Sequence, residues 1–159
     1  MIDLKRTLSI TLGCVVLTDS ELAYLESQLL GRPATVGPNG VPQISPVGFR
    51  YDERLGAIEI SGDHVAATRK FRNIKSHPAV ALVVDDLTSI DPWHARGIEI
   101  RGIARAVERE ATSERPSRRE LIQIRPTRVI AWNLEADHPS WSARDIDECE
   151  GHVPEEVAS

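Results

Sequence analysis

Three cations lie close together in the segment HVAATRKFRN, residues 64–73: Arg69, Lys70 and Arg72. The segment has the pattern of a short helix, because apolar residues recur on one face, at Ala67, Phe71 and Ile74. A helix N-terminus already carries about half a positive charge, so cations are unfavourable there unless water or an anion surrounds them. Two interpretations follow. The cations lie on a solvated helix face, or the helix amides and basic side chains form a phosphate site.

The composition is that of one globular domain without a nucleic-acid partner. The chain has 159 residues, of which 41% are hydrophobic and 27% charged, and its net charge is -5. Residues 135–159 hold eight acidic residues and one arginine, so the remainder carries a charge of about +2. A dedicated nucleic-acid binder would have a larger basic excess.

No set of side chains has the spacing of a catalytic or metal site. Cys14 and Cys149 are isolated, which fits a reducing cytoplasm without excluding one disulfide, and the five histidines are scattered. We therefore predict no catalytic triad and no metal ligands. The apolar run after Arg6 is interrupted by polar residues and has no cleavage site, so residues 1–17 are predicted to be an arm or an extra strand. No run is long enough to span a membrane, and we expect a cytoplasmic protein.

Short strands dominate the predicted secondary structure. A capped helix is expected over 18–31, followed by a three-stranded antiparallel meander in RPATVG, VPQISPVGFRY and AIEISG. After the short basic helix, AVALVVDD reads as a strand buried on both faces, and RGIEIRGIARAVE as a long alternating strand. A polar helix is expected over 113–120, a last strand over 121–135, and coil thereafter.

These elements predict a mainly β fold: a six-stranded antiparallel barrel over residues 18–134, with an acidic tail over 135–159. Pro42 and Pro46 indicate an opening in this barrel, because proline lacks the N–H and is found in a strand only where the hydrogen-bond ladder is open. Part of this strand is therefore expected to be unpaired, so that its backbone can meet a ligand.

Five segments between about Leu30 and Leu134 follow one another in a familiar order: RPATVGPNGVPQISPVGFRYD, AIEISG, TRKFRNIKSHPAVALVVDD, RGIEIRGIARAV and IRPTRVIAWNL. In these segments the chain resembles the pyridoxamine-5'-phosphate-oxidase-like flavin and deazaflavin proteins, which fold as split β-barrels. The ending PTRVIAWNL is most similar to the subgroup that uses coenzyme F420.

The resemblance implies roles for particular residues. The cofactor-phosphate motif corresponds to Thr68, Arg69 and Lys70. The strand along the cofactor ring corresponds to Gln43 through Val47, in which Gln43 and Ser45 share a face, Ile44 is expected to pack behind, and Pro46 and Val47 follow. The end of the strand before the phosphate helix corresponds to Ile60 and Ser61. Trp93, placed in a loop with His94, corresponds to a region that can reach a neighbour's cofactor across a dimer interface.

The resemblance also implies a homodimer with the cofactor at the subunit interface and a small-molecule substrate. The favoured interpretation is an oxidoreductase that uses F420 to deliver hydride to an unsaturated or oxidised compound, with Arg50, Arg72 and Lys75 lining a groove for the F420 tail. One alternative is an FMN-dependent reductase or oxidase on the same fold. Another is a flavin- or haem-binding protein without turnover, with His64 or His94 as candidate haem ligands. The acidic C-terminus does not reproduce the pyridoxine-binding pattern of the oxidases proper, which argues against that activity.

Overall fold

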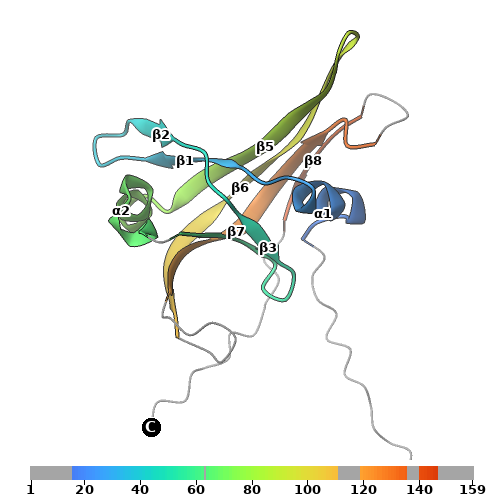
Figure 1. The fold of residues 1–159 in the computed structure, drawn as a ribbon. Helices are drawn as coiled ribbons and strands as arrows, with labels where there is room; N and C mark the ends of the chain where they lie inside the picture. Colours follow the sequence, from blue (N-terminus) through green and yellow to red (C-terminus); the bar gives the residue numbers. More distant parts are fainter. Residues whose placement is uncertain (1–15, 63, 111–118, 136–139, 147–159) are drawn as a thin grey trace, which may run out of the picture.

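The computed structural model describes residues 16–62, 64–110, 119–135 and 140–146 (Figure 1). In these parts antiparallel strands predominate, which confirms the predicted fold class. The elements follow in the order α1 (Asp19–Glu26), β1 (Arg32–Val36), β2 (Pro42–Ile44), β3 (Arg50–Asp52), β4 (Ala57–Ser61), the 3-10 helix η1 (Val65–Ala67), α2 (Arg69–Ser76), β5 (Ala79–Ile90), β6 (Trp93–Arg109), β7 (Arg119–Trp132) and β8 (Trp141–Asp145).

In the part of the chain that the structure describes, the sheet has eight strands instead of the predicted six, for two reasons. The segment VPQISPVGFRY is divided into β2 and β3, and β8 was not predicted. Between β2 and β3, where Pro46 lies, the pairing within the described residues is limited to an isolated bridge between Gly31 and Val47. The expected break is therefore confirmed at Pro46, whereas Pro42 is the first residue of β2 and is paired with Val36.

The segment that contains this break closes the sheet into a barrel. The strand order is β2-β1-β5-β6-β7-β4-β3, with β8 paired to β7 beside this path. The two edge strands are the two ends of one segment, residues 42–52, so this segment joins the edges of the sheet as a split barrel requires. Both pairings of the predicted meander are present, β1 with β2 and β3 with β4. The break separates them, and on their other edges β1 pairs with β5 and β4 pairs with β7.

The barrel interior is aliphatic. Val80, Leu82 and Val84 of β5 point inward and are buried, and α2 adds Phe71 and Ile74 to the same core. The opposite face of β5 is half-buried at Ala81 and Val83, so the prediction that this strand is buried on both faces is wrong. Ala67, predicted on the apolar face of the basic helix, is exposed because it lies in η1, before α2 begins.

Helix α1 begins as predicted and ends early. Thr18 and Glu21 form the capping box, but the helix ends at Glu26, and Leu29 beyond it is 86% exposed. Glu21 is buried, and its carboxylate accepts two hydrogen bonds from Arg144 of β8, at 2.5 and 2.6 Å. The coil predicted after Glu135 is thus wrong over Trp141–Asp145, where β8 pairs with β7.

The prediction for residues 113–120 lies mostly outside the described residues, and its last two, Arg119 and Glu120, belong to strand β7. Residues 1–15, with Cys14, and residues 147–159, with Cys149, also lie outside. Val16 and Leu17, which were predicted to belong to the N-terminal segment 1–17, pack in the core. The domain boundaries at residues 18 and 134 stay predictions. No helix of the described parts is long and apolar enough to cross a membrane.

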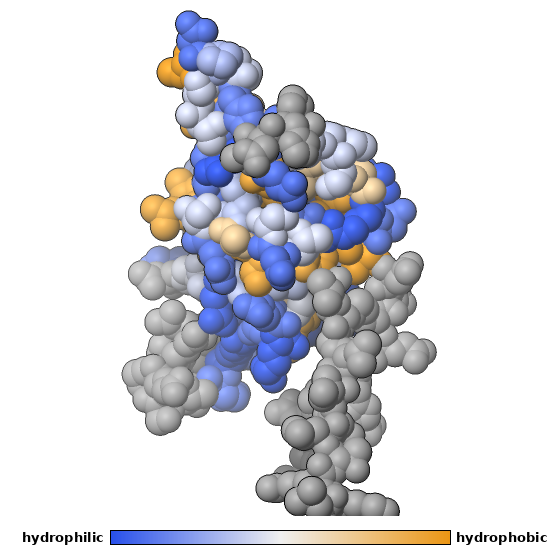
Figure 2. Space-filling model, turned by 90° about the vertical axis from the view of Figure 1, so that its right-hand side faces the viewer, coloured by the Kyte–Doolittle hydropathy of each residue, from blue (hydrophilic) through white to orange (hydrophobic). Residues whose placement is uncertain are grey.

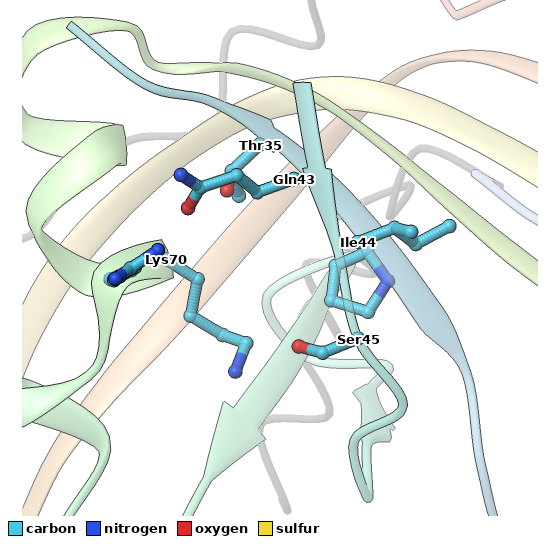
Figure 3. Close-up of a pocket in the computed structure, with 7 residues that line it drawn as sticks. Thr35, Gln43, Ile44, Ser45 and Lys70 are labelled. Atoms are coloured by element: carbon cyan, nitrogen blue, oxygen red, sulfur yellow. The ribbon is translucent and has the colours of Figure 1, made fainter. Parts of the chain in front are cut away.

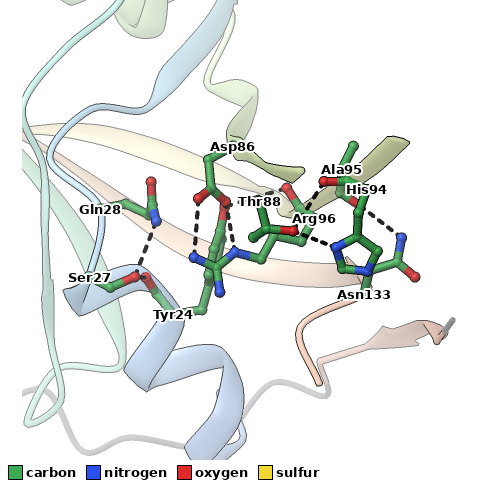
Figure 4. A network of polar contacts seen from close by, with 9 residues as sticks. All are labelled: Tyr24, Ser27, Gln28, Asp86, Thr88, His94, Ala95, Arg96 and Asn133. Atoms are coloured by element: carbon green, nitrogen blue, oxygen red, sulfur yellow. Dashed lines mark hydrogen bonds and ion pairs between the residues drawn. The ribbon is translucent and has the colours of Figure 1, made fainter. Parts of the chain in front are cut away.

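The β5–β6 hairpin projects from the barrel as an arm (Figure 1). At its base, the Tyr24 hydroxyl of α1 donates to Asp86 at 2.9 Å, and Arg96 donates to the same carboxylate at 2.9 and 3.1 Å (Figure 4). The hydrogen bond from Arg96 is the main reason that the pKa of Asp86 lies below its ordinary value. These contacts fix the arm to α1.

Candidate cofactor site

A pocket of about 350 Å³ lies between the first turn of α2 and the β1–β2 hairpin (Figure 3). Its volume is at the lower end of the range for ligand pockets. Two elements supply its walls, and the lining residues are Pro33, Thr35, Gln43, Ile44, Ser45, Arg69 and Lys70.

The helical wall carries the charge. The Thr68 side chain accepts a hydrogen bond from the Phe71 amide and so caps α2. Arg69 and Lys70 follow in the first turn and both line the pocket, while the apolar face of the helix is fixed in the core. The pocket lining therefore contains two cations and no carboxylate, which suits an anion.

The strand wall places polar side chains opposite this helix. Thr35 of β1 pairs directly with Gln43 of β2, so the two side chains share the face that is turned toward α2. Gln43 and Ser45 point toward α2, and Lys70 extends toward Ser45 (Figure 3). The predicted alternation is confirmed, but Ile44 does not pack behind this wall, because it is 65% exposed.

Asn73, a residue that sequence reasoning missed, joins the two walls. It lies on α2, is 5% exposed, and its Nδ2 group donates to Thr35 Oγ1 at 3.0 Å and to Gln43 Oε1 at 3.1 Å. A polar residue between Phe71 and Ile74, on a helix whose apolar face is buried, is the signal that could have identified it.

The other predicted site residues lie outside the pocket lining. Thr68 is the helix cap, and its hydroxyl donates to the Val65 carbonyl at 2.6 Å. Pro46 is exposed, and the backbone of Val47 exchanges two hydrogen bonds with Gly31, at 2.9 and 2.8 Å. Ile60 is buried in the core, and Ser61 is exposed at the end of β4.

Trp93 is not in a loop, because it is the first residue of β6, at the end of the projecting arm. It is 68% exposed, and Ile90 beside it is 77% exposed. Figure 2 shows apolar atoms at the end of this arm. The role predicted for Trp93 therefore depends on a second molecule, because the arm holds it away from the pocket of its own chain.

The three cations predicted for a tail groove have different environments. Arg50 pairs with the buried carboxylate of Glu59 at 2.5 Å, and Arg109 binds the same carboxylate. Arg72 is exposed and donates to the Ala67 carbonyl, and Lys75 lies over the Phe71 ring, 5.0 Å from its centroid. Only Arg72 and Lys75 are thus on the helix that borders the pocket.

Neither candidate haem ligand is in the pocket. His64 is exposed before η1, and the Nδ1 atom of His94 shares a hydrogen bond of 2.5 Å with Thr88 on the arm (Figure 4). Across the described ranges, no three His, Cys, Asp or Glu side chains are grouped as metal ligands would be. A haem-binding function stays a prediction.

Comparison with known proteins agrees with the family resemblance seen in the sequence. The family model described as pyridoxamine 5'-phosphate oxidase matches residues 17–133. The 5a,11a-dehydrotetracycline/5a,11a-dehydrooxytetracycline reductase of Streptomyces rimosus is 42% identical over 131 residues, which cover 81% of this chain and 92% of that protein.

Two solved structures share the fold. One, an F420 reductase, has a TM-score of 0.54 at 26% identity and is matched over 75% of this chain and 100% of its own. The other, a conserved hypothetical protein from Mycobacterium tuberculosis, has a TM-score of 0.59 at 22% identity, over 75% of this chain and 86% of its own.

Proposed function

Because the chain belongs to the pyridoxamine 5'-phosphate oxidase family, we propose that it is an oxidoreductase that uses coenzyme F420 to reduce an unsaturated small molecule. The observation that carries this proposal is the pocket between α2 and the β1–β2 hairpin, with Arg69 and Lys70 on one wall and Gln43 and Ser45 on the other. When bound, the cofactor supplies hydride chemistry, which the protein side chains do not have.

The pocket fits the phosphate end of such a cofactor. Two cations without a neighbouring carboxylate give a site for a phosphodiester or phosphate, and the first amides of α2 add to the positive potential. In the proposal, this pocket of about 350 Å³ holds the phosphate end of the cofactor. In the proposal, the ring lies along β2, where the unpaired stretch around Pro46 presents backbone groups.

The substrate class is proposed from the likeness to the Streptomyces rimosus reductase. A reductase of dehydrotetracyclines suggests that this chain also acts on a carbon–carbon double bond in a polycyclic compound. This chain would contribute binding, orientation and the exclusion of water, which is consistent with the lack of a catalytic triad in its sequence.

A homodimer would complete the site. The outer face of the sheet carries Ile44, Val83, Ile103 and Trp141, of which Val83 is half-buried and the others are exposed. The face also carries charged side chains, since Val83 is paired with Arg32 on one side and with Glu99 on the other. In the proposal, the exposed apolar side chains of this face meet a second copy. We expect the protein to sediment at twice its 17.6 kDa mass, and Val83→Arg to produce a folded monomer. A monomeric parent protein would contradict this part of the proposal.

Titration of the protein with F420 and with FMN, followed by ligand fluorescence, tests the cofactor. The proposal predicts saturable binding of F420 and weaker binding of FMN. Binding of FMN without F420 would replace the proposal by the flavin-dependent alternative on the same fold. Binding of neither would contradict both.

A further inference from the structure

A row of polar side chains crosses the outer face of the barrel on the strands β3, β4, β7 and β6. Directly paired residues form this row, in the order Arg50, Glu59, Gln123 and Arg105. Their neighbours along β4 and β7 belong to the core, so by alternation the row faces outward. Glu59 and Gln123 are nevertheless buried, and arginine side chains donate to both of them.

Around Glu59 the charges of this row are balanced. Arg50 and Arg109 both bind the Glu59 carboxylate. Asp52 lies 3.9 Å from the Arg50 guanidinium and 3.6 Å from that of Arg109. These two arginines therefore have two carboxylates between them.

Around Gln123 the charges are not balanced. Arg105 donates to Gln123 Oε1 at 2.8 and 2.6 Å, and this amide is uncharged. Arg125 lies on the same side of β7, two positions from Gln123, and is exposed. Within the described ranges, no carboxylate forms an ion pair with Arg105 or Arg125. These two cations, which we call the arginine face, attract an anionic group.

The chain leaves β8 beside the arginine face. Because β6 occupies one edge of β7, β8 and β4 share the other edge. β8 runs antiparallel to β7, and after its last residue the Ile146 amide donates to the Thr127 carbonyl at 2.8 Å. Farther along this edge β4 is already paired with β7, from Ile124 onward. The pairing therefore stops near Thr127, which is two positions from Arg125.

The sequence that follows carries the charge that the arginine face attracts. Residues 147–159 contain five acidic residues and no lysine or arginine, and three of the acids are Asp147, Glu148 and Glu150. Four extended residues reach about 13 Å, which is also the length of strand between Thr127 and Gln123. The carboxylates of residues 147–150, the acidic segment, can therefore reach both arginines.

We propose that the acidic segment docks on the arginine face, with its carboxylates paired to Arg105 and Arg125. The docked segment crosses the outside of β7 and closes this face to other anions. Exposed ion pairs are weak and are screened by salt, so the segment is docked at low salt and released at high salt. The inference does not depend on the proposed function, because no residue of the pocket takes part.

Neutralising the acidic segment tests the inference from one side. A triple variant, Asp147→Asn, Glu148→Gln and Glu150→Gln, keeps the length of the segment and changes no described residue. The side-chain Nε–H resonances of Arg105 and Arg125, recorded on the ¹⁵N-labelled full chain at low salt, are expected to shift between the parent and this variant. Unshifted resonances would overturn the inference.

A matched variant controls for the loss of negative charge. Glu155→Gln with Glu156→Gln also removes acids, but at positions beyond the four residues that reach the arginine face. We expect a smaller shift of the two arginine resonances than in the triple variant. Equal shifts in the two variants would show that the arginines respond only to net charge, and would overturn the inference.

Neutralising the arginine face tests the inference from the other side. In Arg105→Gln with Arg125→Gln, the heteronuclear NOE of the backbone amides of residues 147–150 is expected to fall, because the segment is released. Arg72→Gln, which removes an exposed arginine from α2, should leave these values as in the parent. Values that are the same in all three proteins would overturn the inference.

A second copy of the chain is the competing occupant, because Arg125 is paired with Ile103 at the border of the face proposed for the dimer. If the acidic segment occupies the arginine face, the Arg105 and Arg125 resonances respond to salt and not to protein concentration. Resonances that follow the protein concentration, and that are the same in the parent and the triple variant, would assign the face to the second copy and overturn the inference.

Discussion

The ion pair between Glu21 and Arg144 gives a prediction about stability that the structure makes quantitative. The Glu21 side chain is 3% exposed, and its carboxylate accepts two bonds from Arg144, at 2.5 and 2.6 Å, and one from the Thr18 amide at 2.9 Å. Arg144→Met would leave this buried carboxylate without its counter-ion. Breaking a buried pair costs about 3–5 kcal/mol, and we expect about 3 kcal/mol because Arg144 is itself 34% exposed.

In a chain of this length, a loss of about 3 kcal/mol lowers the melting temperature by about 6–12 °C. The matched control is Arg128→Met, because Arg128 of β7 forms an ion pair with Asp145 of β8. Its partner Asp145 is 74% exposed, so we expect a cost of about 1 kcal/mol or less. Urea unfolding of the parent and both variants measures these differences.

The loss should depend on pH. Burial raises the pKa of Glu21, but the Arg144 guanidinium and the Thr18 groups outweigh it, so in the folded parent this pKa lies below its ordinary value of 4.5. A depressed carboxyl pKa contributes stability that is present above the unfolded pKa and is lost as pH falls through the folded one. The difference between parent and Arg144→Met should therefore be full at pH 7 and smaller below about pH 4. A difference under about 0.5 kcal/mol at pH 7, or one that does not change with pH, would refute this reasoning.

Two further predictions concern the sheet and the arm. A Cβ at Gly97 would lie 2.5 Å from a ring carbon of Trp132 and 2.7 Å from the Val84 carbonyl oxygen, so Gly97→Ala should lower stability by about 1–3 kcal/mol, whereas Gly48→Ala, with no atom within 4 Å, should change it little. Equal melting temperatures for the two variants would contradict the close packing inferred at Gly97. Tyr24→Phe removes the hydroxyl that donates to Asp86 and should cost about 1 kcal/mol in urea unfolding, because Arg96 still satisfies that carboxylate. A loss as large as that of Arg144→Met would show that the tyrosine does more than support the arm.

The parts of the fold that local pattern determines were predictable. Thr18 and Glu21 gave the start of α1, the alternation of Gln43 and Ser45 gave the face of β2, and Pro46 gave the break that closes the barrel. In each case the information lies within a few neighbouring residues, as a cap, a period of two or a missing N–H.

The parts that depend on distant partners were not predictable. β8 has five residues and is held by pairing with β7 and by the bond from Arg144 to Glu21, which is 123 positions away in the sequence. Arg50 looked available for a ligand, but it lies in register with Glu59 of β4, which neutralises it. Asn73 escaped notice because only the folded β1–β2 hairpin shows what its amide binds.

The central claim is that the first turn of α2 holds the anionic part of the cofactor, and the affinity of Lys70→Ala for F420 tests it most directly. Loss of a charge-assisted hydrogen bond of roughly 1.5–3 kcal/mol predicts binding about tenfold to a hundredfold weaker than in the parent. Arg54→Ala, which removes an exposed cation from the β3–β4 turn outside the pocket lining, should leave the affinity within about twofold, because exposed charges are screened. A Lys70→Ala protein that binds F420 as tightly as the parent, or no more weakly than Arg54→Ala, would contradict the account.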